Sequence, residues 1–428
     1  MSKTYGFETL SIHAGAGPDP ATGARALPIY QSTAYAFDDA DHAAALFNLQ
    51  TVGFIYSRLT NPTNAALETR LATLEGGRGC TVTASGHSAQ VLALFPLMRP
   101  GDDVVASSRL YGGSLQQMRN TYPKFGWKAH IVDADTPDNF KRALTDTTKA
   151  FFIESLANPG GVISDLEAIA RIADDAGVPL IVDNTMATPW LCKPIDYGAT
   201  LIIHSTTKFL SGTGTSMGGA VVDSGKFDWA KGGKFPSLAG PEPAYHGLNF
   251  FESFGDMAYT FHSHAVGLRD LGPTQAPMNA WLTMLGMETL GLRMERHCAN
   301  AMKVAQWLEK HPSVAWVNYA GLPSNKYNAL ARKYLPKGAG SIFTFGVKGG
   351  YEVGMKVVDS VDLFSHVANI GDAKSLIIHP ASTTHRQLTD EQRVAAGAGP
   401  DVIRLSIGIE TVEDIIADLE QALAKATA

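Results

Sequence analysis

The stretch that decides the fold of this chain is Leu201-Ile202-Ile203-His204-Ser205-Thr206-Thr207-Lys208. Its aliphatic residues, two of them β-branched, predict a buried strand. Hydroxyl side chains and a lysine follow directly. In an open α/β sheet, ligands bind in the crevice outside the carboxyl ends of the strands. Burial would make Lys208 nucleophilic, as a Schiff-base lysine requires. On this stretch alone, an ordinary surface lysine is the better interpretation.

The chain on both sides of this stretch alternates between strand and helix patterns. Short apolar segments predict strands at 80–86, 103–107, 128–133, 149–154, 179–183, 200–204 and 219–223. Helical patterns lie between several of them, at 65–74, 87–98 and 165–176. Apolar strands that alternate with helices predict an α/β fold with a mostly parallel sheet covered by helices.

The two ends of the chain are organised differently from this central part. Residues 1–63 have no clear helix or strand period, but their aromatic residues favour a packed N-terminal arm that contacts a neighbouring subunit. We assign 64–285 to a large cofactor-binding domain and 286–428 to a smaller C-terminal α/β domain. Within these regions we predict a loop or helical excursion at 224–275 and a long helical pattern at 277–311. Three strands are predicted at 341–347, 375–379 and 402–409, and a capping box at 411–414 opens the last helix.

Composition excludes several classes of protein. The chain has 428 residues, too many for one ordinary core, with 45% hydrophobic and 18% charged residues, which describes a globular protein. A formal net charge of −6 argues against a nucleic-acid-binding surface. The cysteines Cys80, Cys192 and Cys298 are far apart and form neither a disulfide framework nor a zinc-site pattern. No run approaches ~18 apolar residues, so we expect no membrane span and a cytoplasmic location.

Two glycine-containing turns bear on cofactor binding. Ser85-Gly86-His87-Ser88 joins a strand to a helix N-terminus, where free N–H groups and the helix dipole favour an anion. Many such junctions bind nothing, so this signal is weak alone. The stretch from Gly212 to Gly218 is not a dinucleotide fingerprint, because Met217 stands where the third glycine is required.

Several single residues have both a structural and a functional interpretation. Asp183 ends the strand before Lys208, so it either caps a turn or pairs with a protonated ring nitrogen. Tyr111, followed by two glycines, either packs or stacks on a flat cofactor. Arg404 in an apolar strand either forms an internal salt bridge or binds a substrate carboxylate. The histidine pairs His262/His264 and His379/His385 lack metal-like neighbours, and structural roles are favoured.

In this order along the chain, these residues resemble the Cys/Met-metabolism family of pyridoxal-phosphate enzymes, fold type I. The matching stretches run over almost the whole chain, at 56–63, 84–86, 111–113, 182–185, 204–208, 379–382 and 404–406. Within the family the chain is most similar to the sulfhydrylases that act on O-acetylhomoserine. It departs from them at Thr213, where a histidine is common. Gly113 stands where methionine γ-lyases usually carry a cysteine.

The resemblance implies a role for each candidate residue. Lys208 would hold the pyridoxal 5′-phosphate aldehyde as a Schiff base and act as the base. Tyr111 would stack on the ring and steer proton transfers. The cofactor phosphate would be bound by Gly86, His87, Ser205 and Thr207, and the phosphate of a neighbouring subunit by Tyr56 and Arg58. Asp183 would pair with the ring nitrogen. Glu154 and Asn158 would line the outer edge of the cofactor. The substrate carboxylate would be bound by Asn369 and Arg404.

The resemblance also implies an activity and an assembly. We expect γ-replacement on O-acetyl-L-homoserine by sulfide or methanethiol, in a homotetramer whose sites are shared between subunits, without a metal, nucleic acid or membrane partner. Cystathionine γ-synthase, O-succinylhomoserine sulfhydrylase and a γ-replacement enzyme with a carbon nucleophile remain open alternatives. A methionine γ-lyase and a non-catalytic protein with this fold are less favoured.

Overall fold

The central element of the protein is a seven-stranded sheet with the strand order β1-β9-β8-β7-β4-β2-β3. The computed structural model describes residues 5–158, 161–384, 386, 389, 391, 393 and 397–428. The run β8-β7-β4-β2-β3 is parallel, and β9 is antiparallel to both β1 and β8. The prediction of a mostly parallel sheet is therefore confirmed. These strands are β1 (Gly79–Thr83), β2 (Asp103–Ser107), β3 (Lys128–Val132), β4 (Thr148–Glu154), β7 (Leu180–Asp183), β8 (Leu201–His204) and β9 (Gly219–Asp223).

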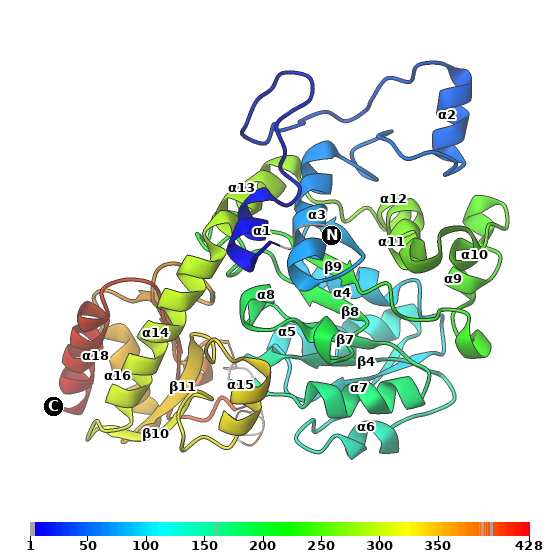
Figure 1. Cartoon of the computed structure of the whole chain (residues 1–428). Coiled ribbons are helices and arrows are strands. Elements are labelled where there is room, and N and C mark those ends of the chain that lie inside the picture. Colours follow the sequence, from blue (N-terminus) through cyan, green and yellow to red (C-terminus); the bar gives the residue numbers. More distant parts are fainter. Residues whose placement is uncertain are drawn as a thin grey trace.

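Helices cover both faces of this sheet. Alternate side chains of each strand point to opposite sides, and apolar side chains on both sides pack against helices. On one face, Val182 and Ile202 pack with α3 (Pro62–Glu75) and α7 (Leu166–Asp175). On the other face, Ile181 and Ile203 pack with α4 (Gly86–Leu94) and α11 (Ala258–His262). Figure 1 shows these helices around the central strands.

The register of the central strands brings the ends of three of them to one level. Glu154 pairs with Asp183 between β4 and β7, and Asp183 pairs with Ile203 between β7 and β8. The predicted adjacency of the strands that precede Asp183 and Lys208 is therefore present in the structure. Since parallel strands end at the same edge, the residues that follow β4, β7 and β8 face a common space.

A second, separate sheet has five strands in the order β10-β11-β14-β13-β12. Its strands are β10 (Val314–Asn318), β11 (Ile342–Val347), β12 (Ser365–His366), β13 (Leu376–Ile378) and β14 (Val402–Ser406). The strands β10 and β12 are absent from the prediction. Helix α14 (Leu290–Leu308) runs along the junction between the two sheets (Figure 1). The predicted single helical pattern at 277–311 is two helices, because the chain breaks at Thr289 between α13 (Pro277–Glu288) and α14.

The predicted capping box at the start of α18 (Val412–Thr427) is wrong. Thr411 is the N-cap residue, but its side chain accepts no hydrogen bond. The N–H of Asp414, which the hydroxyl was expected to bind, donates instead to the carbonyl oxygen of Thr411 at 3.1 Å. A capping box is present at α4, where the side chain of Ser85 accepts from the Ser88 N–H and the Ser88 side chain accepts from the Ser85 N–H.

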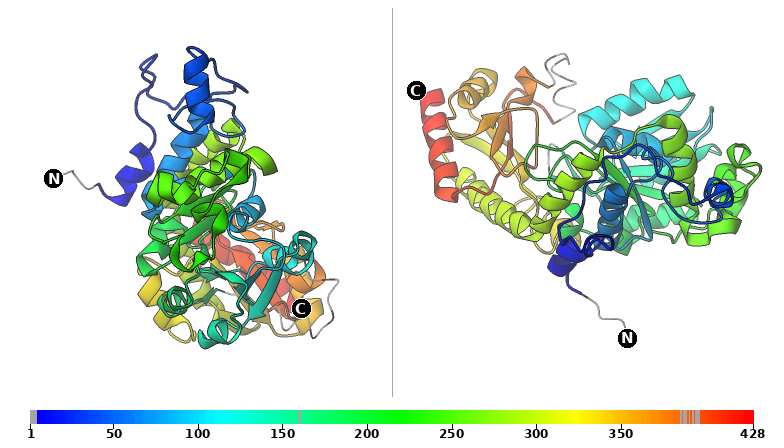
Figure 2. Two further views of the ribbon diagram at one scale, coloured as in Figure 1. Left: turned by 90° about the vertical axis from the view of Figure 1, so that its right-hand side faces the viewer. Right: turned by 90° about the horizontal axis from the view of Figure 1, so that it is seen from above.

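The N-terminal arm contains two helices that the sequence pattern does not reveal. They are α1 (Phe7–His13) and α2 (Ala40–Phe47). Arg70 of α3 donates to the carbonyl oxygens of Ile12 and Ala14, at 2.8 and 2.9 Å, and so holds the end of α1. Figures 1 and 2 show the loops around α2 projecting beyond the rest of the chain.

The remaining elements are short, apart from α16. The predicted helical excursion at 224–275 is confirmed, since it contains α9, α10, α11 and α12. None of the helices in the described ranges is long and apolar enough to cross a membrane. The α-helices and strands of the described residues not yet given bounds are α5 (Gly112–Gln116), α6 (Asp138–Arg142), β5 (Leu156–Ala157), β6 (Val162–Ile163), α8 (Thr188–Leu191), α9 (Pro236–Ala239), α10 (Phe250–Phe254), α12 (Arg269–Leu271), α15 (Asn328–Tyr334) and α16 (Gly350–Asp359).

Candidate active site

A cavity of about 260 Å³ opens at the carboxyl ends of β4, β7 and β8. It is closed on the opposite side by residues 368–370 and by Arg404 of β14. Of the residues predicted for the site, only Tyr56 and Arg58 lie elsewhere. The predicted residues that line the cavity are Gly86, His87, Tyr111, Glu154, Asn158, Asp183, Ser205, Thr207, Lys208, Asn369 and Arg404.

Lys208 lies in this cavity beside the side chain of Asn369. Its Nζ donates to Oδ1 of Asn369 at 2.6 Å. Burial, with a smaller contribution from the positive charge of Arg404, lowers the pKa of Lys208 to about 8. The neutral amine, the form that a nucleophile and general base requires, is therefore far more populated near physiological pH than it would be at the ordinary lysine pKa of 10.5.

Arg404 is bonded to neutral groups within this cavity. It donates to Oδ1 of Asn158 at 3.3 Å and to the carbonyl oxygen of Asn369 at 3.2 Å. The internal salt bridge considered from the sequence is not among the ion pairs of the described residues. Burial lowers the pKa of Arg404 to about 10 and leaves it charged. A half-buried guanidinium of this kind is suited to a carboxylate ligand.

Two buried carboxyl groups face each other at the ends of β4 and β7. Burial raises the pKa of Asp183, and burial together with the charge of Asp183 raises the pKa of Glu154 well above its usual range. Glu154 accepts from the N–H groups of Tyr111 and Asn158 at 2.6 and 3.1 Å, and Asp183 accepts from the Thr185 N–H at 3.0 Å. A nearby cation, such as the protonated ring nitrogen of a cofactor, would oppose this effect of burial and favour the ionised forms.

The turn before α4 has the form of a phosphate-binding site. Gly86 and His87 lie in the first helical turn, where N–H groups have no acceptor within the helix. A Cβ atom at Gly86 would lie 2.8 Å from Cβ of Ser205, so only glycine allows this approach of the two backbones. Thr207 faces the same space, and its Oγ1 accepts from the Gly218 N–H at 3.1 Å. The predicted phosphate-binding residues are thus in one place.

Tyr111 stacks on the imidazole of His87, with ring centroids 5.8 Å apart and the ring planes at 27°. Burial lowers the pKa of His87 and favours its neutral form. A Cβ atom at Gly113 would lie 2.5 Å from the Tyr111 ring and 2.8 Å from the His87 ring. Because residue 113 is glycine, the rings of Tyr111 and His87 can occupy the space that a side chain at this position would fill.

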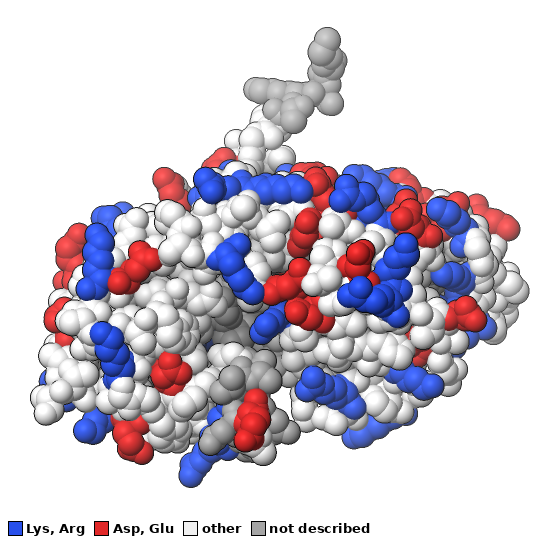
Figure 3. All heavy atoms as spheres, turned by 90° about the horizontal axis from the view of Figure 1, so that it is seen from below, with Lys and Arg blue, Asp and Glu red and all other residues white. Residues whose placement is uncertain are grey.

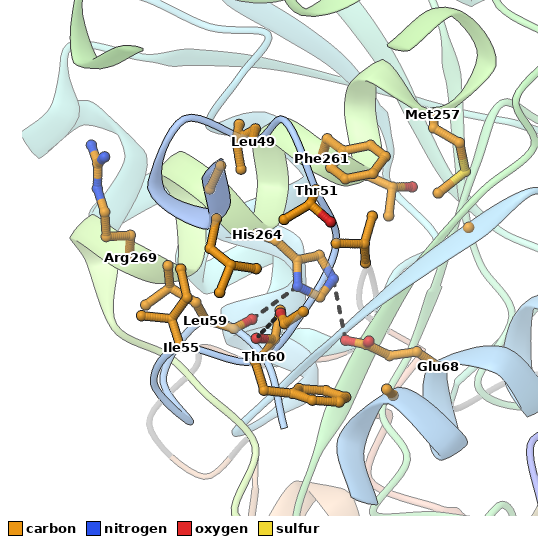
Figure 4. Close-up of a pocket in the computed structure, with 18 of the residues that line it drawn as sticks. Leu49, Thr51, Ile55, Leu59, Thr60, Glu68, Met257, Phe261, His264 and Arg269 are labelled. Carbon is orange, nitrogen blue, oxygen red and sulfur yellow. Dashed lines mark hydrogen bonds and ion pairs between the residues drawn. The ribbon is translucent and has the colours of Figure 1, made fainter. Parts of the chain in front are cut away.

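Tyr56 and Arg58 line a separate recess of about 1270 Å³ between the arm, α3 and residues 244–269 (Figure 4). Arg58 lies 5.4 Å from the centroid of the Tyr56 ring and donates to the carbonyl oxygen of Arg269. In the same recess, His264 is 3.3 Å from Glu68. Neither Tyr56 nor Arg58 reaches the cavity of its own chain.

Sequence reasoning missed part of the cavity lining, namely Gln90, Thr185, Met186, Met217, Ala368 and Ile370. Thr185 has a signal that could have been used, because it lies two residues after the strand-end Asp183. Its Oγ1 accepts from the Ser205 N–H at 2.8 Å and so joins the two loops. The other lining residues carry no local pattern that distinguishes them from packing residues.

The described part of the chain contains no group of three or more histidine, cysteine, aspartate or glutamate residues that could hold a metal ion. His262 is 3.4 Å from Glu242, and His379 is bonded to Ser382; His385 lies outside the described residues. On the face shown in Figure 3, basic and acidic side chains are interspersed.

The fold and this arrangement of a lysine, an aspartate and a glycine-containing helix N-terminus are those of a pyridoxal-phosphate-dependent enzyme. The chain belongs to the Cys/Met metabolism PLP-dependent enzyme family, whose model matches residues 8–424. It is 50% identical over 432 residues to the O-acetyl-L-homoserine sulfhydrylase of Leptospira meyeri, covering 99% of this chain and 98% of the relative. It is 49% identical to the homocysteine synthase of Schizosaccharomyces pombe, covering 97% and 98% of the two chains.

A solved structure agrees with this assignment. The chain is similar to a crystal structure from Campylobacter jejuni described as an O-acetylhomoserine (thiol)-lyase with N′-pyridoxyl-lysine-5′-monophosphate. The TM-score is 0.95 and the identity 43%, and the match covers 98% of this chain and all of the other. The predicted family, fold class and cofactor are therefore confirmed.

Proposed function

We propose that this chain catalyses γ-replacement on O-acetyl-L-homoserine, in which sulfide or methanethiol takes the place of acetate and gives L-homocysteine or L-methionine. One observation carries the proposal. A complete lysine, aspartate and arginine set lines one cavity, in a chain that is 50% identical over its whole length to an O-acetyl-L-homoserine sulfhydrylase.

We assign the cofactor contacts to the residues that line the cavity. The phosphate would be held by the N–H groups of Gly86 and His87 and by the hydroxyls of Ser205 and Thr207. Tyr111 would hold the ring, Asp183 would pair with its nitrogen, and Glu154 and Asn158 would line its edge. The fit rests on the Gly86 approach, which a Cβ atom would close, and on the buried carboxylates, which need a cation.

When bound, pyridoxal phosphate supplies an electron sink for the electrons that are released when the Cα–H bond of the substrate breaks. The rest of the chemistry belongs to side chains. Arg404 holds the α-carboxylate in a two-pronged contact and Asn369 completes this contact. The neutral amine of Lys208 removes the proton from Cα, and the same amine then moves protons at Cβ, while acetate leaves from Cγ. Tyr111 assists the early proton transfers.

Orientation of the substrate favours replacement at Cγ. The cavity is small, and Lys208, Asn369 and Arg404 form a connected hydrogen-bonded set within it. A substrate anchored by its carboxylate therefore presents its Cα to one base and its Cγ to the space through which a thiol enters. The alternatives are O-succinylhomoserine as substrate and cysteine or a carbon nucleophile as acceptor.

We further propose a shared site in a homotetramer, with Tyr56 and Arg58 of one subunit at the phosphate of another. This proposal is supported by their position outside the cavity of their own chain. We also propose that residues 1–63, 64–285 and 286–428 act as arm, large domain and small domain. The three free, buried cysteines suit a reducing compartment, and we propose the cytoplasm.

The test is a direct comparison of substrates with the purified holoenzyme. O-acetyl- and O-succinyl-L-homoserine are each combined with sulfide, methanethiol or cysteine, and the amino-acid product and the released acid are measured. We expect O-acetyl-L-homoserine with sulfide to be among the best pairs. Borohydride should attach the cofactor to Lys208, and Lys208→Ala should lose turnover while Lys303→Ala, on an exposed position of α14, retains it. Turnover by Lys208→Ala would contradict the proposal.

A further inference from the structure

Four buried side chains form a hydrogen-bonded network behind the cavity. Oγ of Ser155 donates to Oδ1 of Asn184 at 2.7 Å, and Nδ2 of Asn184 donates to Oε1 of Glu75 at 2.8 Å. The same Oε1 atom lies 2.6 Å from Nε2 of His204. Glu75, Asn184 and His204 have no exposed surface, and Ser155 has 1%. We call these four residues the strand-end network.

The three network residues that follow or end strands of the sheet are Ser155, Asn184 and His204. Each of them is next in sequence to a carboxyl residue of the candidate active site or to the loop that carries Lys208. Ser155 follows Glu154, and Asn184 follows Asp183. His204 is the last residue of β8 and precedes the loop that leads to Lys208. Because side chains alternate across a strand, the network lies on the face of the sheet opposite to Glu154 and Asp183. It joins the ends of the three strands that carry the site.

Glu75 is the residue that closes the network. It is the last residue of α3, whose apolar side chains pack on the same face of the sheet. Its Oε1 atom is shared by two donors from two different strands, β8 and the residue after β7. A shift of Glu75 therefore moves the ends of both strands. The helix connects this point to the arm that carries Tyr56 and Arg58, because it begins at Pro62.

Electrostatics also links His204 to the ring-nitrogen site. A buried carboxylate is costly without a partner, and the imidazole of His204 is such a partner for Glu75. A positive His204 lowers the pKa of Asp183 and so opposes the effect of burial. The other titratable side chains that act on Asp183 are Glu154 and His87. Nδ1 of His204 and Oε2 of Glu75 have no hydrogen-bond partner among the described residues.

We propose that Glu75 and His204 are positioning residues, whose pair holds the strand ends that lead to Asp183 and Lys208 in place for the cofactor. This inference rests on the cofactor contacts proposed above. Neither residue touches the cavity. Outer partners of this kind at metal sites typically change affinity or activity by about 10–100-fold.

The test uses the full-length holoenzyme and two conservative variants. Glu75→Gln keeps the shape and one acceptor oxygen but removes the charge, and His204→Gln keeps a donor near the position of Nε2. For each we measure the cofactor dissociation constant, the pH titration of the visible band of the lysine-bound cofactor, and the melting temperature of the apoenzyme. We expect the dissociation constant to rise by about tenfold or more and the band to titrate at a different pH.

Asp103→Asn is the matched control. Asp103 is also a buried carboxylate that joins two strands, since it begins β2 and accepts from Thr148 at 2.6 Å, at the opposite end of the sheet. We expect this variant to melt at a lower temperature with an unchanged band and an unchanged dissociation constant.

Three outcomes are distinguishable. If Glu75→Gln and His204→Gln only lower the melting temperature, as Asp103→Asn does, the network is structural and the inference is wrong. If Glu75→Gln is recovered unfolded, His204→Gln alone decides. If the unaltered protein holds no cofactor on Lys208, the proposed function fails, whatever the variants do.

Discussion

The Nζ atom of Lys208 lies 2.6 Å from Oδ1 of Asn369, across the junction between the two sheets. The carbonyl oxygen of the same Asn369 accepts from Arg404. One asparagine thus contacts both the proposed base and the proposed carboxylate-binding group. Lys208 follows a strand of the seven-stranded sheet, and Arg404 lies in a strand of the five-stranded sheet. The distance between the proposed base and the proposed carboxylate-binding group therefore depends on the position of one sheet relative to the other.

The pH dependence of cofactor binding follows from the environment of Lys208. Only a neutral amine attacks an aldehyde, and the pKa of Lys208 is lowered to about 8. Recombination of the apoenzyme with pyridoxal phosphate should accelerate as the pH rises toward about 8 and level off above it. Arg404→Met should move this midpoint to higher pH, because the positive charge of Arg404 contributes to the lowered pKa. Stopped-flow absorbance over a pH series measures both midpoints, and identical midpoints would contradict the electrostatic explanation.

Gly86→Ala should weaken cofactor binding. The added Cβ atom would lie 2.8 Å from Cβ of Ser205 and force the phosphate-binding turn away from the loop after β8. We expect at least a tenfold increase in the dissociation constant, equivalent to about 1.4 kcal/mol. Gly17→Ala is the control, since a Cβ atom there meets nothing within 4 Å. Equilibrium dialysis of both variants is the measurement, and equal affinities would rule out the phosphate contact at this turn.

Mixed oligomers test the role of Arg58 across a subunit interface. Arg58→Ala and Lys208→Ala should each have little activity alone. When they are mixed in equal amounts after dissociation, half of the subunit pairs are mixed and each mixed pair has one intact site. About a quarter of the unaltered activity should therefore return. Activity of the mixture that equals the average of the two variants would show that the arm serves its own chain or no site.

Asp223 should make stability depend on pH. Burial raises its pKa from 3.8 to about 7, so between these values the folded chain keeps a proton that the unfolded chain has released. Stability from this group then falls by about 1.4 kcal/mol per pH unit as the pH rises through that window. Asp223→Asn keeps an acceptor for the Gly225 N–H and removes the charge. The melting temperature of the variant should exceed that of the unaltered apoenzyme by more at pH 8 than at pH 5. A constant difference would mean that Asp223 is not protonated in the folded state.

The strand pattern was predictable because buried parallel strands are continuous apolar runs. The strands β2 and β9 begin and end as predicted, at 103–107 and 219–223. The edge strand β10 was missed, since its residue Trp316 is 38% exposed and its apolar residues do not mark a core. Short helices such as α1 were missed because they are too short for a helical period, and α1 is held in place by Arg70 from a distant helix.

Some features of the candidate site could also be predicted from the sequence, and others could not. From the sequence alone, Asp183 and Lys208 could be placed at neighbouring strand ends, because a short crossover between parallel strands leaves few alternatives. The sequence by itself also determined the family, through motifs spread over the chain. Only the tertiary structure decided that Asn369 contacts Lys208, that Arg58 lies outside its own cavity, and that Glu75 joins strand ends more than a hundred residues away. Such contacts depend on the packing of sheets and helices, which a local pattern of residues does not encode.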